Sequence, residues 1–579
     1  MKKTLALLLA LIMVVGAFVG CGKKEETKAT GNGYGWVNAY FSSSPPTLNK
    51  HASVTESNGE LLSHLVTTLY RTFITEDGKG FEYLPELAES EPIQMDEDGY
   101  VFQIKLRKNV QWDNGDFMNA DTVIYSWKQL FSPDLINVAA SVVLNNSYFD
   151  FVNAQEYAEG EAEWEDVGIK KIDDYTIEIT SKRVSTPLMV MQFTSIQNLC
   201  MVYEPLYEQY MYEDGSGTEY GLSLDKFMGS GRFKLIQWEP DAMFVLERNP
   251  NWIYADKIKV AGINYRVVPD DQTALELFLK GELDYISIAQ TLWEDYEEDP
   301  RIYEYYSDSL MYMFLNIGNP SQNGLIANLD FRKALSHGMD RVEIAKVLDS
   351  KPVSRYVRYS VIGDMTTGQR FITMDGSNDY VVDPATLYNP TLASQHLTKA
   401  LEACNLTSCT FELMYPEGNP IRRATYEMLQ QQYKASLNNK LEIKLRAVAS
   451  GMTLTLRKWD PENPTSYEGT IGSLLPAATD PTAQFKPWVS TYYPPRTLWV
   501  NEEFDSLYAQ SVSVEAMKNN DLRIELCQKM EKIMLDELVV IPVYEIADRV
   551  MFNDRIVLPV EEYNVSEGFG YPTYVSIKD

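Results

Sequence analysis

Hydrophobic and polar positions change their spacing along the stretch from Tyr312 to Leu348. Residues 312–317 are apolar except for Asn316 and are followed by Gly318-Asn319-Pro320, which predicts a buried strand followed by a turn. Apolar side chains then recur at helical spacing, which is typical of a helix packed on one face. We predict that Asp330 caps this helix at its N-terminus and that Gly338 ends it in the left-handed conformation.

Comparable patterns occur before and after this stretch. Asp340, with Glu343 three residues later, predicts a capping box at the start of a further helix. Apolar and β-branched side chains among residues 100–106 predict a strand. A helix is predicted to begin near Asn119, with Asp121 as its cap. These patterns describe α/β units, which many folds contain.

The N-terminus has the pattern of a secretory signal followed by a tether. Residues 1–20 carry Lys2-Lys3 and then an apolar run that is too short for a membrane span. Gly20 before Cys21 is similar to a lipobox, so we expect Cys21 to be lipid-modified and to become the first mature residue. Residues 21–33 are polar and are expected to form a lipid-anchored flexible tether.

Composition narrows the possible partners. The chain of 579 residues is longer than one hydrophobic core usually organises, so we expect several domains. Its net charge of −31 repels nucleic acid and anionic lipid surfaces, which argues against both as partners. Tyrosine is abundant, with 37 residues; we expect most of these rings in cores or half-buried strands and a minority lining a wet cavity.

The sequence gives little support for a metal site, a cofactor site or a catalytic site. The four histidines have no neighbouring ligands at metal-binding spacing, and we expect no cofactor. Cys404 and Cys409 suit either a short-loop disulfide or two buried thiols. The sequence has no G-x-S-x-G, no H-E-x-x-H and no P-loop, so we expect that the protein is not an enzyme.

Several segments, taken together and in order, resemble one family. The segments are Asn316, Leu329-Asp330, residues 332–335 and Met339-Asp340-Arg341 around the central stretch, residues 106–115, residues 229–252, and residues 540–544 near the end. They are similar to the extracellular solute-binding proteins of family 5, which are the substrate-binding lipoproteins of oligopeptide and dipeptide ABC transporters.

The resemblance implies a two-lobed fold of the α/β class, of the periplasmic-binding-protein type II, cluster C, with an additional inserted N-terminal domain. It places the first lobe in three pieces, the extra domain between the first two pieces, and the second lobe before the last piece. The expected boundaries are 34–70, 205–308 and 544–579 for lobe I, 71–204 for the inserted domain, and 309–543 for lobe II.

The resemblance also implies residues that would contact a ligand between the lobes. The expected ligand-binding residues are Ser53, Val54, Thr55, Tyr312, Asn316, Arg457, Ala477, Thr479, Asp480, Tyr544 and Glu545. Peptide-binding members carry an Asp that pairs with the α-amine of the ligand, and the corresponding residue here is Ala477. Asp480 is the nearest carboxylate, and it either replaces that Asp or caps the next helix.

The function that this resemblance implies is capture of oligopeptides and their delivery to an ABC import permease with its ATPase subunits. We expect a monomer on the extracellular face of the cell membrane, held there only by its lipid. Two alternatives remain open. One is a non-peptide ligand such as an oligosaccharide in the same fold, and the other is a surface adhesin or signalling lipoprotein.

Overall fold

The computed structural model describes the chain from residue 34 to residue 578. The gaps within it are residues 77, 79, 136, 145–148, 290–291, 365–368, 419, 438, 450–451, 457–459, 474–479, 493–496 and 565. The signal and tether predicted for residues 1–33 lie outside this part of the chain. Among the residues that the structure does describe, no helix is long and apolar enough to cross a membrane.

The first lobe is built around a four-stranded sheet. Its strand order is β1 (Trp36–Phe41), β10 (Gly262–Val267), β9 (Met243–Arg248) and β8 (Phe233–Glu239), with β1 parallel to β10. Helix α2 (Glu56–Leu65) packs on the sheet through Leu61 and Leu65, which are fully buried with Ile263 and Tyr265. A core therefore forms between segments that lie about two hundred residues apart in sequence.

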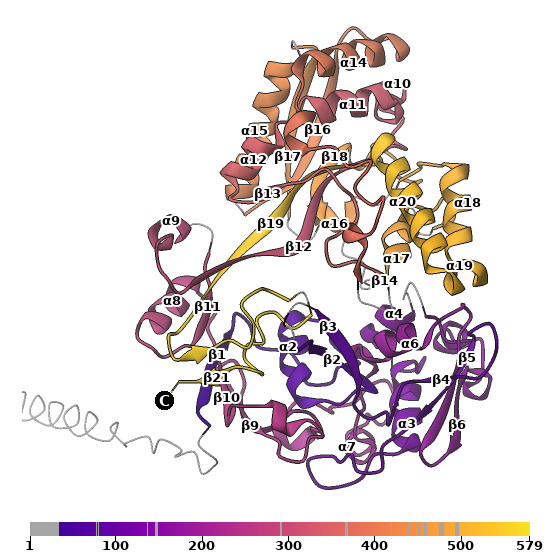
Figure 1. The fold of residues 1–579 in the computed structure, drawn as a ribbon, viewed down its shortest axis with the longest axis vertical. Helices are drawn as coiled ribbons and strands as arrows, with labels where there is room; N and C mark the ends of the chain where they lie inside the picture. Colours follow the sequence, from indigo (N-terminus) through magenta and orange to yellow (C-terminus); the bar gives the residue numbers. More distant parts are fainter. Residues whose placement is uncertain are drawn as a thin grey trace, which may run out of the picture.

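The second lobe contains a seven-stranded sheet whose two longest strands reach the first lobe. The order is β11 (Tyr285–Ser287), β19 (Val540–Phe552), β12 (Ile302–Leu315), β18 (Gly469–Ser473), β16 (Cys409–Pro416) and β17 (Leu441–Val448), with β13 (Lys351–Pro352) also paired to β19. Strands β12 and β19 are antiparallel, and they pair from Ile302 with Met551 at one end to Phe314 with Val540 at the other. Figure 1 shows these two strands running between the lobes.

Helices cover the second lobe in two groups. The first group comprises α10 (Ser321–Gly324), α11 (Leu329–His337), α12 (Arg341–Val347), α13 (Pro384–Leu387), α14 (Pro390–Ala403), α15 (Pro420–Ser436) and α16 (Met452–Leu456). Of these, α15 packs on β16 and β17, α16 on β16, and α12 on β13 and β19. The second group comprises α17 (Pro481–Phe485), α18 (Glu502–Ser511), α19 (Val514–Lys518) and α20 (Asn520–Asp536). Short strands β14 (Ile362–Asp364) and β15 (Gln369–Arg370) pair with each other near this second group.

A separate domain lies beside the first lobe and has its own core. It contains the pair β2 (Tyr70–Ile74) and β3 (Phe81–Pro85), and the sheet β4 (Ile93–Gln94), β5 (Val101–Lys105), β7 (Thr176–Thr180) and β6 (Ile169–Asp173). Its helices are α3 (Ala120–Leu130), α4 (Val138–Leu144), α5 (Ala154–Ala158) and α6 (Pro187–Thr194). Ala483 of α17 joins this core, so the domain also touches the second lobe.

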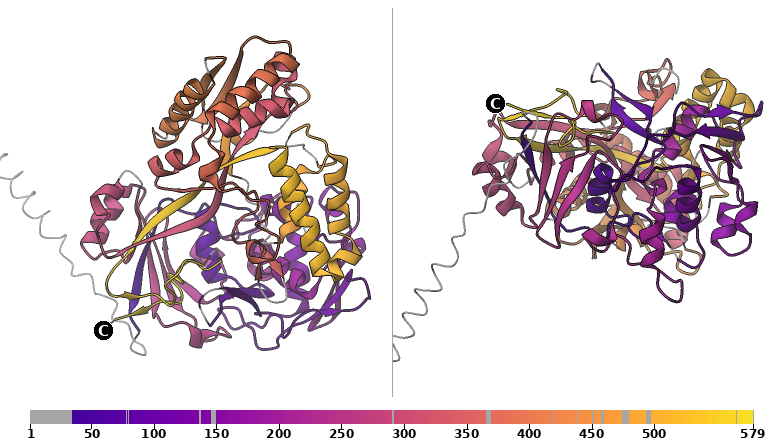
Figure 2. Two further views of the ribbon diagram at one scale, coloured as in Figure 1. Left: turned by 45° about the horizontal axis from the view of Figure 1, so that its top comes forward. Right: turned by 90° about the horizontal axis from the view of Figure 1, so that it is seen from below.

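The remaining elements complete the first lobe. They are α7 (Glu204–Gln209), α8 (Asp271–Leu279), α9 (Trp293–Tyr296), β20 (Ile556–Val557) and β21 (Ser576–Ile577). The C-terminal segment returns to the first lobe, where the buried carboxylate of Asp284 binds Arg555 Nε at 2.6 Å and the backbone N–H of Asn38 at 2.7 Å. Figure 2 shows the chain end beside the first lobe from two further directions.

Two details of helix α11 differ from the prediction. Asn328, not Asp330, is its N-cap, and the Asn328 side chain accepts a hydrogen bond from Phe331 N at 3.2 Å. Asp330 lies in the first turn, where it pairs with His396. Gly338 is right-handed, with φ −82°, and a Cβ there would meet the ring of Tyr433 at 3.1 Å. Close packing of α15 therefore explains this glycine better than a left-handed turn.

Two other predicted caps can also be compared with the structure. Asn119, not Asp121, caps α3: its side chain accepts a hydrogen bond from Thr122 N, and the Thr122 hydroxyl accepts one from Asn119 N, which completes a capping box. Asp340 does cap α12 as predicted and accepts from Glu343 N at 3.0 Å. The return bond of that capping box is replaced, because Asp340 N donates to Gln432 instead.

Cys404 and Cys409 are not joined by a disulfide. Both are buried thiols, as are Cys200 and Cys527. Of the two alternatives that the sequence left open, the structure therefore has the pair of buried thiols.

Candidate ligand-binding cleft

A pocket of about 460 Å³ opens where the first lobe meets the two long strands. It is lined by the end of β1, the first turns of α2, β11, β19 and the C-terminal segment. Tyr305 of β12 also lines it, just before that strand continues into the second lobe. The pocket volume is in the range typical of small-ligand sites.

Aromatic rings form most of the pocket wall. Tyr305 stacks on Tyr563 with ring centroids 4.0 Å apart, and Tyr285 stacks on Tyr571 at 4.9 Å. The hydroxyl of Tyr571 donates to Asn38 O at 3.1 Å, which fixes the C-terminal segment against β1. The wall therefore combines residues from both ends of the chain, and its rings hold one another in place.

Helix α2 contributes two carboxylates to the pocket. Thr55 caps the helix by accepting a hydrogen bond from Asn58 N at 3.4 Å, so Glu56 occupies the first turn and Glu60 follows one turn later. Residues four apart on a helix lie on the same face, and both side chains line the pocket. The pocket therefore has two acidic groups on one wall and aromatic rings on the others.

Glu60 is crowded by protein although its side chain is open to the pocket. Burial among these atoms raises the pKa of Glu60 to about 7, the hydrogen bond from Tyr265 lowers it, and neighbouring Glu56 raises it. Tyr265 OH donates to Glu60 Oε1 at 3.3 Å and lies 2.9 Å from His64 Nε2. Burial, with Arg232 and Arg71 nearby, holds the pKa of His64 well below its usual value, so its ring is neutral.

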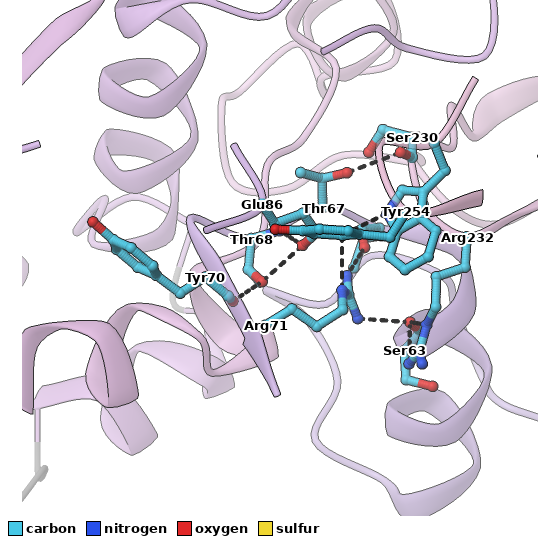
Figure 3. Close-up of polar contacts among 12 residues, drawn as sticks. Ser63, Thr67, Thr68, Tyr70, Arg71, Glu86, Ser230, Arg232 and Tyr254 are labelled. Carbon is cyan, nitrogen blue, oxygen red and sulfur yellow. Dashed lines mark hydrogen bonds and ion pairs between the residues drawn. The ribbon is translucent and has the colours of Figure 1, made fainter. Parts of the chain in front are cut away.

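The far end of α2 is held by two buried arginines (Figure 3). Arg71 donates to Ser63 O at 3.0 Å and to Val66 O at 2.6 Å, and Arg232 donates to Ser63 O at 3.0 Å. These carbonyls belong to the last turn of the helix, where cations interact favourably with the helix dipole. The arginines therefore fix the helix that carries Glu56 and Glu60.

Glu86 holds Arg71 in place. Its Oε1 lies 2.7 Å from Arg71 Nε and accepts from Trp252 Nε1 at 2.8 Å, while Oε2 accepts from Thr68 N at 2.9 Å. The Arg71 and Glu86 side chains are only 7% and 1% exposed. A buried ion pair is stable only when its remaining polar atoms are satisfied, and here both partners have further hydrogen bonds.

The two long strands are irregular where they pass from one lobe to the other. Their register shifts between Tyr306 and Leu310, and Asp308 within this bulge has φ +61°. The Asp308 carboxylate accepts from Ser360 N at 3.0 Å and lies 3.6 Å from Arg358 Nη1. A bulge breaks the regular ladder and bends a strand, so β12 departs from regular pairing where it passes between the lobes.

Glu545 lies on the opposite strand beside this bulge. Its side chain is almost completely buried, and burial raises its pKa to about 7. Lys351 lowers that pKa and Asp308 raises it. Tyr544 is also buried, which raises the pKa of its hydroxyl to about 12. These two residues, predicted as ligand contacts, lie at the junction of the lobes.

The predicted residues near α2 fall at the edge of the pocket. Thr55 lines it, whereas Ser53 is buried and its hydroxyl lies 3.3 Å from that of Thr55. Val54 is exposed. Thr55 therefore lies at the candidate pocket, whereas Glu56 and Glu60, the two carboxylates of the helix, were not among the predicted residues.

Tyr312 and Asn316 make structural contacts within the second lobe. The Tyr312 hydroxyl donates to Tyr356 O at 2.6 Å. Asn316 Nδ2 donates to Pro464 O and Tyr467 O, both at 2.9 Å, and the residue is fully buried. Neither side chain lines the pocket described above, and the contacts account for both as core residues.

Asp480 has no free oxygen for a ligand amine. Its Oδ1 accepts from Thr482 N at 2.8 Å, its Oδ2 binds Arg523 Nη1 at 2.5 Å, and its side chain is 0% exposed. Of the two roles that the sequence left open, the structure shows the helix cap and adds a buried ion pair. Arg457, Ala477 and Thr479 lie outside the described residues, as does Cys21.

The sequence analysis missed the residues that shape the pocket. The missed residues are Glu56, Glu60, Tyr40, Tyr285, Tyr305, Tyr563 and Tyr571. The abundance of tyrosine in the sequence was the available signal for such a pocket, but it did not indicate which tyrosines would line it. Among the described residues, no group of three or more His, Cys, Asp or Glu side chains is arranged to hold a metal ion.

Comparisons with known proteins agree with this architecture. Residues 82–494 match the model of bacterial extracellular solute-binding proteins, family 5 Middle, and this is more than half of the chain. The protein therefore belongs to the family of bacterial extracellular solute-binding proteins, family 5.

Individual relatives cover almost the whole chain. The dipeptide-binding protein DppE of Bacillus subtilis is 26% identical over 81% of this chain and 80% of its own length. The oligopeptide-binding protein OppA of the same species is 23% identical over 94% of both chains. The structure of Listeria monocytogenes OppA bound to peptide has a TM-score of 0.68 at 20% identity, covering 95% of this chain and all of that one.

Proposed function

We propose that the protein captures peptides in the cleft between its lobes and delivers them to an ABC import permease. The carrying observation is the position of the pocket. It lies on the first lobe, against the two strands that continue into the second lobe. A ligand bound there would therefore be within reach of both lobes. Membership of the family supports a peptide as the ligand, as do its relatives DppE and OppA, which are named as dipeptide-binding and oligopeptide-binding proteins.

The division of the chain into lobes belongs to this proposal. We place the first lobe at 34–70, 205–308 and 544–579, the extra domain at 71–204 and the second lobe at 309–543. Separate hydrophobic cores support this division, because one core is built largely from residues between Leu69 and Met201 and another from residues between Leu310 and Tyr544.

Closure of the cleft is the proposed binding step. A ligand that contacts both lobes binds the closed form better, and it shifts the population toward that form by this difference in affinity. The bulge at Asp308 and the buried Glu545 beside it are the proposed hinge, because here β12 and β19 lose their regular register. No catalytic step is required.

The anchoring and assembly of the protein are proposed from its sequence. A lipid on Cys21 would hold the protein at the outer face of the membrane, and residues 22–33 would let it reach the permease. We propose a monomer that presents its closed, peptide-loaded form to the permease and its ATPase subunits. An adhesin or a signalling lipoprotein would have the same cleft but would not deliver its ligand to a permease.

Native mass spectrometry of protein purified without denaturation tests the proposed ligand. Peptide capture predicts a ladder of additional masses that fit short peptides and disappear after denaturation and refolding. A single co-purified non-peptide mass, or thermal stabilisation by oligosaccharides and not by a peptide mixture, would contradict the proposal. Growth on peptides as the only amino-acid source, with and without the gene, separates transport from adhesion.

A further inference from the structure

The pocket on the first lobe has a charge that favours one kind of ligand group. Glu56 and Glu60 point into it from successive turns of α2, and among the described residues that line it none is Lys, Arg or His. Lys50 is a buried cation beside the first turns of α2, but it donates to Asn58 Oδ1 at 3.3 Å and does not line the pocket. Arg71 and Arg232 bind carbonyls at the opposite end of the helix and pair with Glu86 and Glu567, respectively. The described lining of the pocket therefore contains two carboxylates and no cationic side chain.

The aromatic wall strengthens the same preference. Rings of Tyr40, Tyr285, Tyr305, Tyr563, Tyr571 and Phe569 line the pocket. The faces of aromatic rings attract ammonium and guanidinium groups, and cages of such rings recognise organic cations in other proteins. A cavity that combines these rings with two carboxylates complements a positively charged group that also has apolar surface.

We propose that this pocket binds the positively charged group of the ligand, either its α-ammonium or a lysine or arginine side chain, through Glu60 and Glu56. This proposal rests on peptide capture as the proposed function. It moves the amine-binding carboxylate from the second lobe to helix α2 of the first lobe. Asp480 is committed to Arg523, and Ala477 has no carboxylate, so the first lobe supplies the acid instead.

A carboxylate of the ligand is the competing occupant of this pocket. The N-terminal turn of α2 lies at the pocket and would attract an anion through its backbone N–H groups. Two of those groups already have partners, because Asn58 N donates to the Thr55 side chain and Gly59 N to the Thr55 carbonyl. Glu56 and Glu60 add repulsion, so the electrostatic balance favours a cation.

Binding should depend on pH because Glu60 titrates near neutrality. The groups that face it are Glu56 on its own helix and the hydroxyls of Tyr40, Tyr265, Tyr285 and Tyr571, whose raised pKa values keep them neutral. A cation binds the ionised carboxylate, so affinity should rise as pH increases through about 7 and then level off. Binding below this pH should release a proton.

Calorimetry with a matched set of peptides and variants tests the proposal. The peptides share one short sequence and are unmodified, N-acetylated, C-amidated, or N-acetylated with one lysine added. The variants are Glu60→Gln and Glu56→Gln, and Glu276→Gln is the control because it makes the same charge change on the exposed face of α8. Thermal unfolding of each variant checks that it folds.

The expected result is a loss of at least about 30-fold in affinity when Glu60→Gln removes the charge, as for truncation of one partner of a bound charge pair. Acetylation should cause a similar loss in the wild type if the α-ammonium is the bound group. Recovery by the added lysine would identify a side chain as a second source of the cation. The Glu60→Gln variant should also lose the dependence on pH, and Glu276→Gln should bind as the wild type does.

Three outcomes would overturn the proposal. The first is unchanged peptide affinity in the folded Glu60→Gln and Glu56→Gln variants. The second is a loss caused by C-amidation and not by acetylation, which would place a ligand carboxylate in the pocket. The third concerns the case in which no peptide binds the wild type, so that peptide capture itself fails. Tetramethylammonium then replaces the peptides as the probe. If it quenches the tyrosine fluorescence of the wild type no more than that of Glu60→Gln, the cation site is contradicted as well.

Discussion

The carboxylate of Asp480 lies 2.5 Å from the guanidinium of Arg523, and both side chains are buried. The same carboxylate caps α17, so one residue joins two helices of the second lobe. Removing one partner of such a pair leaves an uncompensated charge in the protein interior. Breaking the pair should therefore affect stability more than binding.

Replacing Asp480 with Asn should lower the free energy of unfolding by about 3–5 kcal/mol, because Arg523 would remain buried without its counter-ion. Urea denaturation followed by tyrosine and tryptophan fluorescence measures the change. Asp98→Asn is the control, because Asp98 pairs with Lys518 at the surface, with side chains 55% and 52% exposed. That variant should change stability by no more than about 1 kcal/mol. Equal effects of the two substitutions would show that the buried pair has no special role.

Replacing Glu86 with Gln should loosen the helix that carries Glu60. Glu86 binds Arg71, and Arg71 binds the last turn of α2, so the variant leaves a buried guanidinium unpaired. We expect a loss of about 3 kcal/mol or more in stability and faster amide hydrogen exchange in α2. Asp121→Asn, which breaks an exposed pair with Lys171, serves as the comparison. Exchange in α2 that does not change would contradict the role given to these arginines.

Replacing Glu545 with Gln should stabilise the protein at high pH. Because the pKa of Glu545 is raised to about 7 in the folded state, its contribution to stability is fully present below its usual pKa and is lost as pH rises through about 7. The variant stays neutral, so at pH values above 7 it should exceed the wild type by about 1–3 kcal/mol. Urea midpoints measured across this pH range test the difference. Glu525→Gln, at an exposed pair with Lys529, should show no such trend.

The four described cysteines should be unreactive in the folded protein. All are buried thiols, and burial raises the pKa of Cys200 and of Cys409 to about 12. Thiolate is the reactive form, so a thiol reagent should label none of them quickly under native conditions and all of them after unfolding. Rapid labelling of any described cysteine before unfolding would show that its surroundings open easily.

Much of the architecture was predictable because the relevant signals are local. Asp340 caps its helix through a bond to a residue three positions later, and the apolar run from Tyr312 continues a strand. The cap of α11 was predicted wrongly as Asp330, because the local pattern did not indicate that the helix begins two residues earlier, after Asn328. Backbone geometry did, because only Asn328 has the extended conformation of a cap.

The pocket was not predictable from such signals. Glu60, Tyr305 and Tyr571 meet only after α2, β12 and the C-terminal segment have packed together, and they lie hundreds of residues apart in sequence. The ion pair of Asp480 likewise depends on Arg523 in a later helix. The likeness to a known family indicated the general position of a cleft, but the charge and aromatic character of this one required the structure.

The central claim is that peptides bind in the cleft between the lobes, and calorimetric titration tests it most directly. Ligand-free protein is titrated with a mixture of short peptides and, separately, with the same mixture hydrolysed to free amino acids. The account predicts saturable binding of the peptides at one site per protein and no comparable binding of the hydrolysate. Equal heats from both mixtures, or no saturable heat from the peptides, would contradict it.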